Sequence, residues 1–102
     1  MLTFLALTSL SSGTNVSGTG KIEFNLYGCC AGKECTTCED TYIILDNPVS
    51  YNNKTYLKLK IENNDLHDEI YHLYSEKIKI KGTVISPQDD ILKINLTEIS
   101  SL

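Results

Sequence analysis

The clearest structural signal in the chain is Lys77-Ile-Lys-Ile-Lys-Gly-Thr-Val-Ile85. Apolar and charged residues alternate along it, so that Ile78, Ile80 and Val84 fall on one side and the lysines on the other. A period of two is the pattern of a half-buried β-strand. Gly82 interrupts the apolar row, which predicts a bend or the close approach of another backbone. The stretch therefore predicts a strand that buries one face.

Four other segments predict strands, at residues 21–26, 41–45, 56–62 and 91–99. Turn-forming residues at 46–48, 51–54 and 86–90 separate some of them. One short helix is expected at residues 66–74, because cap residues precede it and Leu66, Ile70, Leu73 and Tyr74 recur at helical spacing. The residues expected to point inward from these strands are Ile22, Phe24, Leu26, Leu57, Leu59, Ile61, Leu92, Ile94 and Leu96.

The element order β-β-β-α-β-β is that of the five-stranded Greek-key barrel known as the OB-fold. Residues 73–85, followed by Ile91-Leu-Lys-Ile-Asn-Leu-Thr-Glu-Ile99, resemble the second half of small exported bacterial OB-fold domains. Several such domains also carry cysteines just after their first strand. The resemblance spans about residues 20–99. It implies that residues 20–102 form an all-β, OB-fold-like barrel with one short helix. It implies a fold more than a function, and a β-sandwich or β-grasp domain is the alternative.

Residues 1–19 are expected to form a lead into this domain. Met1–Leu10 is mostly apolar, and a run rich in serine, glycine, threonine and asparagine follows. This order is similar to the end of a secretory signal, although no basic residue precedes the apolar run. The alternative is an additional N-terminal strand. Ten apolar residues are too few to cross a bilayer, so the sequence predicts no transmembrane segment and favours export, for example to a periplasm, over a cytoplasmic location.

All four cysteines lie in Gly28-Cys-Cys-Ala-Gly-Lys-Glu-Cys-Thr-Thr-Cys38, so the cluster requires a local cause. The first hypothesis is a zinc site, or a site for another thiophilic metal, with Cys29, Cys30, Cys35 and Cys38 as ligands. Four thiolates form a closed tetrahedral site, and Cys35-x-x-Cys38 has the spacing that grips one ion. The neighbouring Cys29 and Cys30 would need a tight bend, because adjacent side chains diverge.

Three other chemistries compete with zinc. Two disulfides would form in an oxidising compartment, either Cys29–Cys35 with Cys30–Cys38 or the nested pairing, and would imply no activity. Residues 30–38 also match the C-x4-C-x2-C run of plant-type [2Fe–2S] ferredoxins, but no cysteine follows for a fourth ligand. Finally, the cysteines could be free or redox-active thiols.

The predicted ligand face lies on the second and third strands, where OB-folds bind their ligands. It comprises Tyr42, Ile44, Tyr56, Lys58 and Lys60, flanked by the cysteine segment and by residues 86–90. Tyrosines among lysines could bind single-stranded nucleic acid. The net charge of −4 and the absence of arginine oppose that partner.

These patterns predict a non-enzymatic binding or accessory module with a cysteine segment cross-linked by metal or disulfides. Its ligand would be a small partner or a metal. The first alternative is a redox or electron-transfer protein that uses the cysteine cluster, and the second is a single-stranded nucleic-acid binder.

Overall fold

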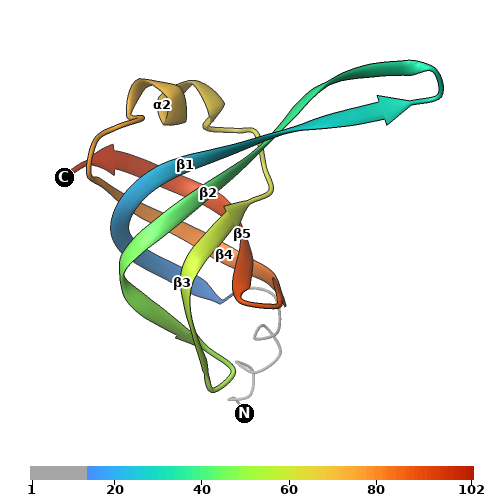
Figure 1. Cartoon of the computed structure of the whole chain (residues 1–102). Helices are drawn as coiled ribbons and strands as arrows, with labels where there is room; N and C mark the ends of the chain where they lie inside the picture. Colours follow the sequence, from blue (N-terminus) through green and yellow to red (C-terminus); the bar gives the residue numbers. More distant parts are fainter. Residues whose placement is uncertain (1–13) are drawn as a thin grey trace, which may run out of the picture.

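The computed structural model describes residues 14–102. Nearly all of the described chain is β-strand, with one short helix, as predicted (Figure 1). The elements are β1 (Asn15–Ala31), β2 (Glu34–Tyr51), β3 (Lys54–Ile61), α2 (His67–His72), β4 (Ile78–Gln88) and β5 (Ile91–Ser101).

The five strands form a closed barrel in the order β1-β2-β3-β5-β4. All neighbouring strands are antiparallel except β3 and β5, which pair in parallel between Lys58 and Ile61 of β3 and Ile91 and Ile94 of β5. A parallel pair cannot be joined by a tight turn, and here α2 and β4 lie between its two strands in sequence. The predicted OB-fold-like barrel and its element order are therefore confirmed.

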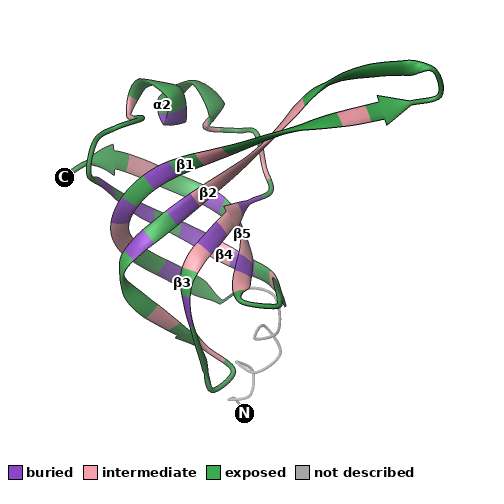
Figure 2. Ribbon diagram, in the orientation of Figure 1, coloured by how far each residue is buried: buried purple, intermediate pink, exposed green. Residues whose placement is uncertain are grey.

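The barrel interior holds one apolar core, to which every strand contributes (Figure 2). Two glycines let strands approach closely. A Cβ on Gly20 would lie 2.1 Å from the carbonyl oxygen of Ile44, and one on Gly82 would lie 2.6 Å from that of Asn95. The close approach predicted at Gly82 is confirmed. The core residues are Val16, Ile22, Ile43, Leu45, Tyr56, Leu59, Ile61, Ile70, Ile78, Ile80, Val84, Leu92, Ile94 and Leu96.

The helix lies over one end of the barrel (Figure 1) and buries Ile70 there. It is shorter than the predicted segment, and Leu66 occupies its N-cap position without a side-chain hydrogen bond. Asn63 is one of the cap residues that precede the expected helix, but its side chain forms hydrogen bonds with β5. Its amide nitrogen donates to the Leu96 carbonyl oxygen at 2.9 Å, and its amide oxygen accepts from the Leu96 nitrogen at 2.7 Å. This pair of bonds fixes the connection between β3 and α2.

Several details differ from the predictions. Leu26 and Leu57, expected in the core, are 63% and 51% exposed. The expected turn at residues 46–48 belongs to β2, where the pairing with β3 shifts register between Ile44 and Val49. The barrel begins at Asn15 and not at Gly20, because the end of the predicted lead pairs with β4. The apolar segment before it lies outside the described residues.

Candidate functional site: a disulfide-bonded ribbon and the outer face of the barrel

Beyond the barrel, β1 and β2 continue as a two-stranded arm, which we call the ribbon (Leu26–Glu39). Its strands pair with each other from Leu26 and Glu39 to Ala31 and Glu34. Gly32, the first residue of the tight turn, has a φ of +66°, a conformation that glycine adopts without steric cost. The ribbon projects away from the barrel, and almost all its side chains are exposed (Figures 1 and 2). It therefore adds nothing to the core.

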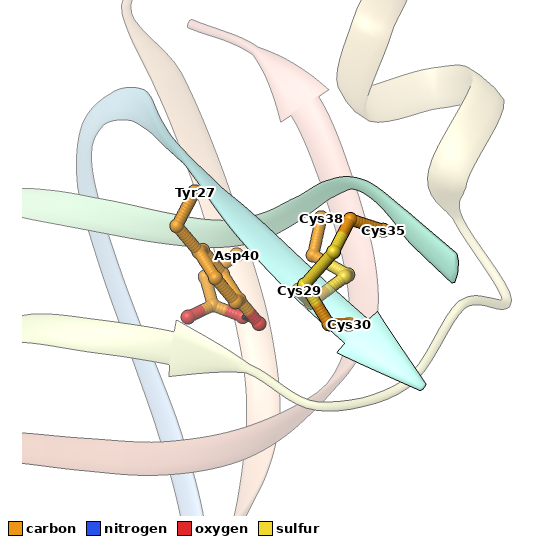
Figure 3. Close-up of a disulfide and its surroundings, with 6 residues drawn as sticks. All are labelled: Tyr27, Cys29, Cys30, Cys35, Cys38 and Asp40. Carbon is orange, nitrogen blue, oxygen red and sulfur yellow. Dashed lines mark hydrogen bonds between the residues drawn. A yellow bond between two sulfur atoms is a disulfide. The ribbon is translucent and has the colours of Figure 1, made fainter. Parts of the chain in front are cut away.

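Two disulfides join the strands of the ribbon, Cys30–Cys35 and Cys29–Cys38 (Figure 3). Cys30 and Cys35 lie directly opposite each other, whereas Cys29 and Cys38 are diagonal neighbours. Successive side chains of a strand point to opposite faces, so Cys29 and Cys30 leave β1 on different sides. The two bridges consequently hold the ribbon from both faces.

The structure has the nested disulfide pairing among the alternatives that the sequence left open. All four sulfurs are paired in the two disulfides, so in this form none is a thiolate that could bind zinc or an iron–sulfur cluster. In a strand, the adjacent cysteines point apart, which keeps the sulfurs from converging on one ion. Within residues 14–102, no group of three or more side chains is placed to bind a metal. The redox alternative stays a prediction.

Aromatic packing fixes the base of the ribbon against the helix. The Phe24 ring stacks on Tyr71 and Tyr74, with centroid distances of 4.9 and 5.1 Å. The Tyr71 hydroxyl donates to both carboxylate oxygens of Glu39, one of them at 2.7 Å. This hydrogen bond, together with some burial and the nearby negative charge, raises the pKa of Tyr71. The ribbon thus leaves the barrel in a fixed direction.

Sequence reasoning missed this anchor, although part of its signal was present. Tyr71 and Tyr74 are three residues apart, which places them on one side of a helix. Phe24 alternates with the other inward residues of β1. On the opposite side of the ribbon, the Tyr27 hydroxyl donates to Asp40 at 3.4 Å (Figure 3). The pairing of β1 with β2 brings Tyr27 near Asp40, and the packing of the helix segment against β1 brings Tyr71 and Tyr74 to Phe24.

Four of the five residues predicted for the ligand face lie together on the outside of β2 and β3. Tyr42 is opposite Lys60 in the register, and Ile44 is opposite Lys58. We call this surface the outer face (Tyr42, Ile44, Lys58 and Lys60). The fifth residue, Tyr56, is only 4% exposed and belongs to the core. The register shift between Ile44 and Val49 explains this correction, because it changes which side of β3 faces inward.

Neighbouring acids compensate the lysines of the outer face. The Lys58 ammonium lies 4.4 Å from the centre of the Tyr42 ring and 3.7 Å from a Glu23 oxygen. The Lys60 ammonium is 3.8 Å from Asp40 and 3.6 Å from Glu62. Burial lowers the pKa of Lys60, but the two carboxylates outweigh burial and raise it. The face is therefore mixed in charge and not strongly basic.

The predicted flanking segments lie at opposite ends of the barrel (Figure 1). The ribbon begins beside the outer face at one end. The turn between β4 and β5 lies at the other end, where the Lys54 ammonium donates to the Asp89 carbonyl oxygen at 2.9 Å. Of the two segments, the ribbon is the one that extends beyond the barrel and could reach a partner.

Comparison with known proteins does not place the chain in a family. No protein-family model matches it, and neither a curated protein nor a solved structure is significantly similar to it. None of the helices in the described part of the chain is long and apolar enough to span a membrane. The resemblance to small exported OB-fold domains stays a prediction.

Proposed function

We propose that this domain is a non-enzymatic binding module of an oxidising, extracytoplasmic compartment, which holds a protein partner against the outer face and the ribbon. One observation carries the proposal: two disulfides hold an arm that contributes no residue to the barrel core. Covalent bonds on both sides of such an arm stabilise its shape and not the barrel. A fixed, exposed shape is useful for contact with another molecule.

The energetics of association support a role for the rigid ribbon. An isolated two-stranded hairpin is marginally stable in water, so a reduced ribbon would have to order itself when it binds. The disulfides and the Phe24–Tyr71 stacking order it beforehand, which lowers the entropy lost on association. Disulfides persist in oxidising compartments, which supports an extracytoplasmic location.

The outer face suits a protein better than a single-stranded nucleic acid. Such binders combine a positive groove with open aromatic faces. Here the two lysines are next to Glu23, Asp40 and Glu62, and Lys58 lies over the Tyr42 ring. We expect no binding of a fluorescent oligothymidine, even at low salt. Salt-sensitive binding that is lost in Lys58→Ala would favour the nucleic-acid alternative.

Site-specific photocrosslinking in cells of the source organism tests the proposal. A photoreactive residue at Lys33, in the ribbon turn, and one at Ile44, on the outer face, should capture the same protein. The exposed Lys79 on β4 is the matched control and should not capture it, because it lies on neither surface. The proposal would be overturned if neither position captured a protein, or if all three captured it equally.

A further inference from the structure

The ribbon has two free strand edges. β1 pairs with β4 only as far as Gly20, and β2 pairs with β3 only from Thr41 onward. Between these points and the turn, each strand of the ribbon has one neighbour, which is the other strand. Backbone donors and acceptors on the outer sides of both strands are therefore open to another strand.

Two observations show which backbone groups of β1 point to its free edge. The Thr14 carbonyl oxygen accepts from the Val84 nitrogen at 2.8 Å, so even-numbered residues face the β4 side, and the register stays regular to Ala31. Cys30 and Cys35 are 4.0 Å apart at Cα, the short spacing of a pair that does not exchange hydrogen bonds. Both place the N–H and C=O groups of Leu26, Gly28 and Cys30 on the free edge.

The two edges differ in how they resist pairing. Natural edge strands carry charges, prolines or bulges that prevent association. The β2 edge has Glu34, Glu39 and Asp40. The β1 segment 24–31 has no charged residue, no proline and no register shift. It also exposes 63% of Leu26 and 44% of Tyr27. Only the β1 edge is therefore open to pairing without electrostatic repulsion.

We propose that the β1 edge of the ribbon pairs antiparallel with the same edge of a second copy of this chain. The two ribbons then form one four-stranded sheet in the order β2-β1-β1-β2, with a two-fold axis through Gly28. In a symmetric interface of this kind, one surface must complement itself. The exposed Leu26 comes opposite Cys30 of the second copy, and Tyr27 comes opposite its Cys29. Both exposed apolar side chains thereby gain a neighbour.

Charge selects this register and this occupant. Because hydrogen-bonded pairs must join even-numbered residues, a change of register moves the partner of each residue by two positions. The two-fold axis then moves by one residue. With Gly28 on the axis, residues 25–31 of the two copies lie opposite one another up to the end of β1 at Ala31, and none of them is charged. Moving the axis to Cys29 would shorten the pair to residues 27–31, and moving it to Tyr27 would bring the charged Glu23 into it. The uncharged segment therefore complements itself, whereas a charged extended peptide would bring its charges to this edge.

The inference goes beyond the proposed function, because it concerns a second copy of this chain paired with the β1 edge and not a different protein held by the outer face and the ribbon. Tyr27 and Tyr42 lie on the same side of the sheet formed by β1 and β2, so the dimer would present two outer faces together. A monomeric protein would overturn the dimer and leave partner binding at the outer face standing. The photocrosslinking experiment and the experiment below can therefore fail separately.

Sedimentation velocity with two proline variants tests the dimer. Gly28 and Thr37 lie opposite each other, and their N–H groups point to the β1 and β2 edges respectively. Each substitution with proline removes one donor without breaking a bond inside the ribbon. An edge contact is small and weak, so concentrations from about 5 to about 500 µM are compared. We expect dimerisation of the wild type and of Thr37→Pro, whereas Gly28→Pro should stay monomeric.

A second variant excludes a folding artefact. Leu26→Lys changes a largely exposed side chain, keeps the backbone donor and replaces the apolar side chain opposite Cys30 of the second copy with a charged one. It should raise the dimer Kd at least about tenfold with an unchanged melting curve, because the apolar contact between residue 26 and Cys30 is lost at both symmetric positions. Intact mass confirms that both bridges have formed in each variant. A wild type that is monomeric at the highest concentration, or dimers of Gly28→Pro and Leu26→Lys as stable as the wild type, would overturn the proposal. Loss of the dimer in Thr37→Pro alone would also overturn it and assign the contact to β2.

Discussion

Replacing all four cysteines with serine should free the ribbon while the barrel stays folded. Residues 26–37 are exposed apart from the half-buried Cys29, and no ribbon residue belongs to the core. A two-stranded hairpin without such a core is marginal in water. Without the disulfides, we therefore expect the strands between Leu26 and Glu39 to separate, while the core beneath them still unfolds cooperatively.

The loss in free energy of unfolding depends on whether the ribbon stays ordered in the variant. The Cys29–Cys38 bridge has a sequence separation of 9, and closing such a loop restricts the unfolded chain by about 2.6 kcal/mol at 25 °C. A variant whose ribbon stayed ordered would lose at least about that much free energy of unfolding, because it also lacks the Cys30–Cys35 bridge. Its Tm would fall by at least about 10–20 °C. If the ribbon frays, the folded state gains about the same conformational entropy that the unfolded state gains when the bridges are removed. The two effects on the free energy of unfolding then nearly cancel. We therefore expect a loss below about 1 kcal/mol, which is a Tm decrease of at most about 4–8 °C.

Thermal melting and amide hydrogen exchange together distinguish the two cases. We expect rapid exchange between Leu26 and Glu39 and continued protection of Leu59 and Leu92 in the core. The matched variant Cys30→Ser/Cys35→Ser keeps the bridge nearer the barrel, so its ribbon should retain protection near Tyr27. A Tm decrease beyond about 10 °C with the ribbon amides still protected would refute the reasoning. Loss of the cooperative transition would show that the barrel itself requires the ribbon.

Three further predictions concern the barrel. In a urea titration, Gly20→Ala should lower the free energy of unfolding by about 1–3 kcal/mol, because the new Cβ would meet the Ile44 carbonyl. The control Gly28→Ala, whose Cβ would have no atom within 4 Å, should lower it by less than about 0.5 kcal/mol. The hydrogen bond to Glu39 raises the pKa of Tyr71 above the ordinary tyrosine value. The resulting stabilisation is present below about pH 10 and is lost as pH rises through the raised pKa. In an ultraviolet titration, Glu39→Gln should lower the pKa of Tyr71. Asp46 accepts hydrogen bonds from Lys77 at 2.7 Å and from Thr19 at 2.9 Å, and these bonds lower its pKa. Their contribution to stability is present above about pH 4 and is lost as pH falls through the lowered pKa. In Lys77→Met the titration midpoint of the Asp46 carboxyl should rise, and an unchanged midpoint would contradict the assignment.

The barrel could be predicted from sequence because β4 and β5 bury the apolar residues that their alternating patterns indicate. Ile78, Ile80 and Val84 are buried as expected, and so are Leu92, Ile94 and Leu96. Their lysine neighbours keep the opposite side in water. The order of the elements then leaves few arrangements that bury one face of every strand. The fold class follows from these local patterns.

The third strand shows where the same reasoning fails. Its sequence alternates through Leu57, Leu59 and Ile61, yet Leu57 is exposed and Tyr56 is buried. The register shift between Ile44 and Val49 changes the phase of β3 relative to β2. Such a shift depends on a partner strand that is distant in sequence, so the pattern within residues 56–62 cannot reveal it.

The ribbon was missed for a different reason. The strands expected at residues 21–26 and 41–45 leave the cysteine segment outside both of them, whereas in the structure β1 runs to Ala31 and β2 begins at Glu34. The signal for the longer strands was in the sequence. Tyr27, Thr36 and Thr37 favour strands, and Gly32-Lys33 lies midway between Cys30 and Cys35, as the turn of a hairpin would.

Secondary structure decides the chemistry of the four cysteines. In a loop, Cys29 and Cys30 could bend toward one ion, and the same residues would then form a metal site. In a strand they point to opposite faces, so each must find its partner on its own side of the neighbouring strand. The sulfurs of Cys35 and Cys38 are available there, one on each face. An arm that is cross-linked on both faces keeps its shape without a core, and this holds its uncharged β1 edge in a fixed position.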